Sequence, residues 1–151
     1  MGKFAPVCPA HIAAQLKNWH MLGEYHLLLA HDVAANSEAY ASAYMVNRWE
    51  QGTIIMDNSI IELGDSVDLQ MIKTAADTVQ ANVVVLPDVL LDCQGTVDRI
   101  AEALPLWQEA FEIGKMSSLD RLRFMYVPQG QTREEWIKCA QQLAKDRKSV
   151  V

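Results

Sequence analysis

Polar residues follow four separate apolar runs of the chain, at the point where each run ends. In the stretch QGTIIMDNSIIELG, the β-branched and apolar run Thr53–Met56 is followed directly by Asp57 and Asn58. The corresponding residues after the other runs are His31 and Asp32, Pro87 and Asp88, and Pro128, Gln129 and Gly130. Carboxylates, imidazoles and carboxamides are the groups that proteins use to transfer protons and to hydrogen-bond a ligand.

The apolar runs predict four β-strands with helical segments between them. The strands are expected at His26–Ala30, Thr53–Met56, Asn82–Leu86 and Arg123–Val127. Each is a continuous apolar run, which is typical of strands buried on both faces in a parallel sheet covered by helices. In such α/β folds the active site lies at the carboxyl ends of the strands, so the polar residues are expected to gather at one rim. Glu62 is a further candidate for this rim.

Helical spacing and capping residues predict five helices. They are expected at Pro9–Leu22, from Asn36 or Ser37 to about Trp49, from Asp65 or Ser66 through Val79, at Thr96–Ile113, and from a capping box of Thr132 and Glu135 to about Lys145. Pro105 should kink or divide the fourth of these helices.

An Asp that follows a strand is often only a helix cap or a turn former, and we expect this role for Asp65 and Asp92. No predicted helix begins directly after Asp57 or Asp88, so these two are the stronger functional candidates. His31 is expected to be a hydrogen-bonded histidine of the rim. No glycine-rich phosphate loop, His-Glu-x-x-His or Gly-x-Ser-x-Gly motif is present, which weakens kinase, metalloprotease and esterase hypotheses.

Length and composition indicate one globular domain. The chain has 151 residues, of which half are apolar, and a formal net charge of −6, which gives no general attraction to nucleic acid. Cys8, Cys93 and Cys139 lie far apart in the sequence, a pattern that favours a reducing cytoplasm over a disulfide framework. No apolar run is long enough to span a membrane, so no membrane partner is expected.

Three segments in this order and spacing resemble the tRNA-guanine transglycosylase superfamily: MDNSIIELG, VVVLPDVLLD and MYVPQGQTREEW. The likeness is closest to its short, phage-type and DNA-modifying branch, the DpdA-like 7-deazaguanine transglycosylases, and covers roughly Tyr25 to Leu143. The resemblance implies a (β/α)8 barrel, of the TIM type, that exchanges a guanine in a nucleic acid for a 7-deazaguanine. The enzyme would be a pentosyltransferase.

The resemblance also implies roles for individual residues. Asp57 matches the family's proton-handling Asp, Asp88 the Asp that recognises the base, and Gln129 with Gly130 the Gln-Gly pair that contacts the same base. Asn58 and Glu62 would belong to the same substrate pocket. The match is imperfect, because the tRNA enzymes have Asp-Ser-Gly-Gly-Phe-Gln where this chain has DNSIIE. The aromatic stacking residue is therefore missing at that point, and Glu62 replaces an amide.

A barrel of this kind needs eight βα units and about 250 residues, whereas four units are recognisable here. We therefore expect residues 1–151 to form a single partial barrel domain, the N-terminal half. The resemblance places the nucleophilic Asp and the zinc-binding cysteines in the second half, so no cofactor or metal is expected in this chain. A missing C-terminal half, or a homodimer of half-barrels, would cover the exposed sheet edges and strand faces.

The residues leave other functions open. One alternative is a non-catalytic module that binds a nucleobase or nucleoside. Another is an unrelated barrel lyase that uses Asp57 and Glu62 as acid and base. Within the transglycosylase hypothesis, the sequence leaves both tRNA and DNA open as the substrate, and it does not define which 7-deazaguanine is inserted.

Overall fold

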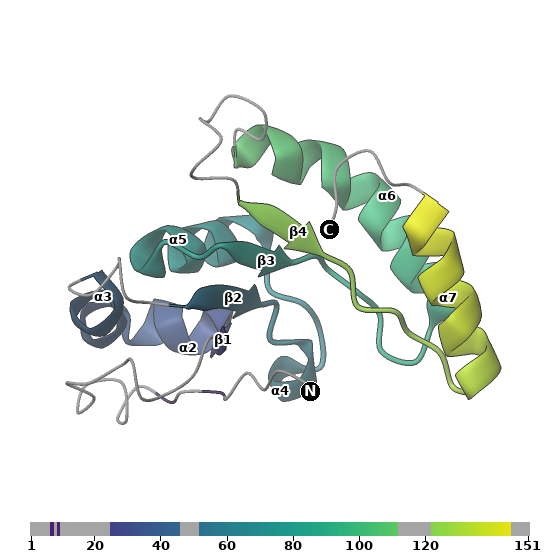
Figure 1. The fold of residues 1–151 in the computed structure, drawn as a ribbon, viewed down its shortest axis with the longest axis horizontal. Coiled ribbons are helices and arrows are strands. Elements are labelled where there is room, and N and C mark those ends of the chain that lie inside the picture. The colour runs from purple at the N-terminus through teal and green to yellow at the C-terminus, as the bar shows by residue number, and fades with distance from the viewer. Residues whose placement is uncertain (1–6, 8, 10–24, 46–51, 112–121, 146–151) are drawn as a thin grey trace.

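The described part of the chain is an α/β structure built on one sheet of four parallel strands (Figure 1). The computed structural model describes residues 7, 9, 25–45, 52–111 and 122–145. The strands, in their order across the sheet, are β1 (Tyr25–Leu29), β2 (Thr53–Asp57), β3 (Val83–Val85) and β4 (Arg123–Met125). Helices separate them along the chain, so the predicted alternation of parallel strands and helices is confirmed.

Six described helices connect or follow the strands. They are α2 (Ala30–Ala35), α3 (Ser37–Met45), α4 (Ile60–Leu63), α5 (Leu69–Val79), α6 (Cys93–Ala110) and α7 (Arg133–Lys145). The helices α2 and α4 were not predicted from the sequence. The predicted helix Pro9–Leu22 and the end of the helix expected to reach Trp49 lie outside the described residues.

One face of the sheet carries a continuous buried row that crosses all four strands. Leu28 pairs with Met56, Met56 with Val84, and Val84 with Phe124. None of these four side chains is more than 1% exposed. The rings of Trp107 and Phe111, at α6 and its C-terminus, pack against Phe124 with centroid separations of 6.1 and 5.8 Å. This face therefore forms the core together with the helices.

The opposite face is covered less completely. Neighbouring strand residues point to opposite faces, and Leu27, Ile55 and Met125 on this second face are only half-buried. The prediction of burial on both faces holds for β3, whose three residues are all buried, and is wrong for β1 and β2, where buried and half-buried residues alternate. Asp57 lies on this half-buried face, in register with Leu29.

Two helices begin at residues other than those predicted. Asp68 caps α5 by accepting a hydrogen bond from the Met71 amide at 2.8 Å, so the predicted start at Asp65 or Ser66 is wrong. Asp92 caps α6 by accepting from the Gly95 amide at 2.9 Å, which confirms its predicted capping role. The helix nevertheless begins at Cys93 rather than at Thr96.

Pro105 lies inside α6, which continues through it as one helix. A proline cannot donate to the carbonyl four residues earlier, here that of Ala101. Ala101 and Pro105 are both exposed, so water can hydrogen-bond that carbonyl. Of the two predicted effects of Pro105, a kink or a division of the helix, the division is wrong. The predicted capping box of α7 is confirmed, because Thr132 Oγ1 accepts from the Glu135 amide and a Glu135 carboxylate oxygen accepts from the Thr132 amide, both at 3.2 Å.

The two faces of β1 allow a matched test. Leu28→Ala should lower the free energy of unfolding by about 3–5 kcal/mol, because it leaves a cavity in the buried row. Leu27→Ala, the same change one residue earlier on the half-buried face, should cost clearly less. Urea denaturation of both variants measures the difference. Equal losses would show that the second face is packed as tightly as the first.

Candidate functional site

The turn after β2 positions the first two candidate residues. Asp57 accepts a hydrogen bond from the Ser59 amide at 3.0 Å, and Asn58 Oδ1 accepts from the Ile60 amide at 3.1 Å. Ser59 has a φ of 63°, the left-handed conformation that non-glycine residues rarely adopt, and it directly precedes α4. Both polar side chains are thus fixed by main-chain amides of the tight turn that follows them. Asn58 is almost completely buried, whereas Asp57 is half-buried.

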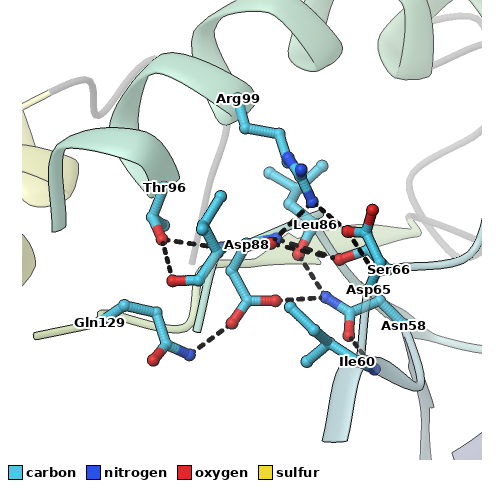
Figure 2. Close-up of polar contacts among 10 residues, drawn as sticks. Asn58, Ile60, Asp65, Ser66, Leu86, Asp88, Thr96, Arg99 and Gln129 are labelled. Atoms are coloured by element: carbon cyan, nitrogen blue, oxygen red, sulfur yellow. Dashed lines mark hydrogen bonds and ion pairs between the residues drawn. The ribbon is translucent and has the colours of Figure 1, made fainter. Parts of the chain in front are cut away.

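Asp88 lies at the centre of the site, between residues from the loops after β2 and β4 (Figure 2). Asn58 Nδ2 donates to Asp88 Oδ1 at 2.7 Å, and Gln129 Nε2 donates to Asp88 Oδ2. Asp88 is only 1% exposed. A buried carboxylate is costly unless donors satisfy it, and charge-assisted hydrogen bonds of this kind are strong. The structure therefore brings Asn58, Asp88 and Gln129 into direct contact.

The main chain around Asp88 is held from several sides, as Figure 2 shows. Asn58 Nδ2 also donates to the carbonyl of Leu86 at 2.9 Å, which links the β2 turn to the end of β3. Arg99 Nη1 donates to the carbonyl of Asp88 at 3.1 Å and forms an ion pair with Asp65. Asp65 thus helps to orient Arg99. It does not cap α5, so the capping role predicted for it is wrong.

Two hydroxyl groups complete this support. Ser66 Oγ accepts from the Asp88 amide at 3.3 Å, and Thr96 Oγ1 accepts from the Val89 amide at 2.9 Å. Thr96 Oγ1 also donates to the carbonyl of Val89 at 3.1 Å. The loop between β3 and α6 is therefore fixed by side chains from α6 and from the segment before α5.

Ser66, Thr96 and Arg99 were not identified from the sequence as part of the site. Their partners on the β3–α6 loop are 7 to 22 residues away and lie outside the helix or segment that carries each side chain, so no local sequence pattern connects them. One signal was available: a loop that leaves a buried strand must satisfy its main-chain polar groups, and polar side chains nearby are the natural donors and acceptors.

Gln129 contacts both the β3–α6 loop and α7. Its Oε1 accepts from the Leu91 amide at 3.1 Å, and its own amide donates to Cys139 Sγ at 3.4 Å. The next residue, Gly130, packs so closely on α7 that an added Cβ would lie 2.6 Å from the Trp136 nitrogen. A side chain at position 130 would push the loop away from α7. The glycine therefore has a structural requirement of its own, besides the base contact that the family resemblance implies.

Asp57 has a raised pKa. The main cause is desolvation by burial, and the nearby carboxylates of Glu62 and Asp88 raise the pKa further, against the lowering effect of the Ser59 and Asn58 amides. Glu62 is exposed on α4. A carboxyl group whose pKa is raised beside other carboxylates is suited to accept and return a proton.

The candidates after β1 take different positions. His31 and Asp32 lie in α2 rather than in a loop, and Asp32 accepts from the Tyr40 hydroxyl at 2.8 Å, so it supports the packing of α2 and α3. The His31 amide donates to Ser59 Oγ at 3.3 Å. Among the described residues, no partner hydrogen-bonds the buried His31 Nδ1, so the predicted hydrogen-bonded ring is wrong for this atom.

Cys93 and Cys139 lie near each other, since Cys139 Sγ is 3.9 Å from the carbonyl of Cys93. Within the part of the chain that the structure describes, no three His, Cys, Asp or Glu side chains form a set that could hold a metal ion. The family resemblance places its zinc-binding cysteines in the second half of the barrel, so Cys93 and Cys139 are not candidates for that site, and we derive no step through a metal. No helix in the described ranges has the length and apolar character needed to cross a membrane.

No protein-family model and no curated protein matches this chain in sequence comparisons.

The raised pKa of Asp57 predicts a pH-dependent gain in stability for Asp57→Asn. The folded state holds the Asp57 proton more tightly than the unfolded state, so wild-type stability falls as pH rises from the unfolded pKa through the folded one. The asparagine can still accept from Ser59 and avoids this penalty. Its Tm should exceed that of wild type at pH 7, and the difference should shrink towards pH 4. The exposed Asp98→Asn is the control, and an equal Tm change there would argue against burial as the cause.

Proposed function

We propose that this chain supplies the base-binding half of a barrel-type transglycosylase, which exchanges guanine in tRNA or DNA for a 7-deazaguanine. One observation carries the proposal. The loops after β2, β3 and β4 bring Asn58, Asp88 and Gln129 together at the carboxyl edge of the sheet, beside Asp57 with its raised pKa. The site thus combines a hydrogen-bonding carboxylate with a group that can exchange a proton.

The two unequal faces of the sheet support the barrel. A doubly wound sheet has helices on both faces, whereas a barrel has helices only outside and side chains inside. Here one face is buried against helices, and the half-buried face carries Leu27, Ile55 and Asp57. In the proposed enzyme this second face is the barrel interior. Four further βα units, from another segment or from a second copy of the chain, would close it.

The hydrogen-bonding pattern of Asp88 suits a guanine edge. Guanine presents N1–H and its 2-amino group as neighbouring donors, and a carboxylate offers two neighbouring acceptor oxygens, each with two lone pairs. Both oxygens of Asp88 already accept from amide N–H groups, which are donors of the same type. Gln129 contacts Asp88 on the side opposite Asn58 (Figure 2). A base must leave its stack in the nucleic acid to reach such a site.

Asp57 would handle the proton of base exchange. The departing guanine must gain a proton, and the incoming base must lose one before it bonds to the sugar. A single carboxyl group with a raised pKa can deliver and then receive that proton. We assign the attack on the sugar C1′ to a carboxylate of the remaining βα units. The lyase alternative has weaker support, because its second group, Glu62, is exposed on α4.

The proposal predicts that Asp88→Ala weakens binding of 7-cyano-7-deazaguanine about tenfold to a hundredfold in calorimetry. Each lost hydrogen bond to a charged group is worth about 1.5–3 kcal/mol. Asp57→Asn should preserve binding and abolish guanine exchange in the complete enzyme. A non-catalytic module would bind the base in the same way and show no exchange.

The matched control is Asp98→Ala, which removes an exposed carboxylate from α6. Circular dichroism must show that each variant is folded, because Asp88→Ala removes an acceptor from the buried Asn58 amide and from the half-buried Gln129 amide. Unchanged affinity in a folded Asp88→Ala protein would remove the base-recognition role.

A further inference from the structure

The Gln129 carboxamide lies between one acceptor and one donor on the β3–α6 loop. Its Nε2 donates to Asp88 Oδ2, and its Oε1 accepts from the main-chain N–H of Leu91 at 3.1 Å. These partners are 41 and 38 residues away in the sequence, so the Gln129 side chain links the loop after β4 to the β3–α6 loop. The loop thus offers an oxygen acceptor and an N–H donor side by side, and one planar amide group satisfies both.

Leu91 has an unusual conformation for this contact. Its φ is 61°, which a leucine adopts only at a cost in free energy, and its side chain is 60% exposed. Such conformations persist where the surrounding structure enforces them, and they concentrate at ligand-binding sites. In this conformation the Leu91 N–H is directed at the Gln129 carboxamide. The side chain itself contributes little burial that would explain the strain.

The lactam edge of guanine has the same hydrogen-bonding order as a carboxamide. In guanine and 7-deazaguanine the ring carries N1–H next to C6=O, so a donor and an acceptor stand on adjacent atoms, as in the Gln129 side chain. N1–H would take the place of Nε2 at Asp88 Oδ2, and O6 would take the place of Oε1 at the Leu91 N–H. Adenine has an acceptor at N1 and a donor at C6, so it would face Asp88 and Leu91 with both groups reversed.

We infer that the Gln129 carboxamide is an internal substitute for the lactam edge of the base, and that the Leu91 N–H recognises O6 after Gln129 has moved aside. This inference rests on the proposed function and changes the role of Gln129 from a direct base ligand to a gate. When the base takes the place of the Gln129 carboxamide, two hydrogen bonds are lost and two others form, so the buried Asp88 is not left unpaired.

The neighbouring contacts permit this movement. Asn58 stays on Asp88 Oδ1 and keeps the carboxylate oriented, and Oδ1 retains a second lone pair for the 2-amino group. The Gln129 main chain stays attached through its amide to Cys139 Sγ, so a rotation of the side chain is sufficient. The 2-amino group, N1–H and O6 of the base would then hydrogen-bond Asp88 Oδ1, Asp88 Oδ2 and the Leu91 N–H, in that order.

Calorimetry with 7-cyano-7-deazaguanine tests the gate. A ligand that must displace a closed side chain binds with an affinity reduced by the fraction of open protein. If the open state is populated at a few per cent, Gln129→Ala should bind about tenfold to a hundredfold more tightly than wild type. Gln129→Asn, which is one methylene shorter and cannot span both contacts, should also bind more tightly. Gln131→Ala, at an exposed glutamine of the same loop, should match wild type.

Two simpler bases test the recognition of O6. Hypoxanthine keeps N1–H and O6 and should bind Gln129→Ala, whereas 2-aminopurine lacks both and should not. Equal binding of the two bases would overturn the role of the Leu91 N–H. If both Gln129 variants bind 7-cyano-7-deazaguanine no more tightly than wild type, while Asp88→Ala still weakens binding, the gate is overturned and the proposed function stands. No binding by wild type or by any variant would overturn both.

Discussion

The buried carboxylate of Asp88 is the constraint on which the rest of the site depends. With 1% of its surface exposed, it has to obtain from the protein the hydrogen bonds that water would otherwise give. Asn58 and Gln129 supply them from the turns after the two neighbouring strands. The parallel order β2, β3, β4 brings these three turns to one edge of the sheet. The order of the strands therefore brings together the loops whose side chains hydrogen-bond the Asp88 carboxylate.

The same constraint explains the elaborate support of the β3–α6 loop. Ser66, Thr96 and Arg99 hydrogen-bond its main chain, so the loop can hold Asp88 below the surface without losing its own hydrogen bonds. Asp57 lies beside this arrangement on the half-buried face, where burial and two carboxylates raise its pKa. Stability alone does not require a carboxyl group there. A proton-transfer site beside a ligand site needs both features: a carboxylate whose hydrogen bonds are satisfied, as in Asp88, and a carboxyl group with a raised pKa, as in Asp57.

Much of this could be predicted from the sequence, because strand runs and helix caps are local signals. The four strands, the Asp92 cap and the capping box of α7 follow from such patterns. The short helices α2 and α4 escaped prediction because six and four residues are too few to show a helical period. The carboxyl-edge position of Asp57, Asp88 and Gln129 follows from parallel topology, whereas the pairing of Asp88 with two amides depends on tertiary contacts 30 and 41 residues apart.

The central claim is that Asp88 recognises a guanine-type base in this cluster. The most direct measurement is NMR of the ¹⁵N-labelled chain during titration with guanine, which follows the side-chain amides of Asn58 and Gln129 and the main-chain amide of Leu91. We predict saturable shifts of Gln129 and Leu91, a smaller shift of Asn58, and none of these shifts with adenine. Unchanged signals at all three residues, or equal responses to guanine and adenine, would contradict the account.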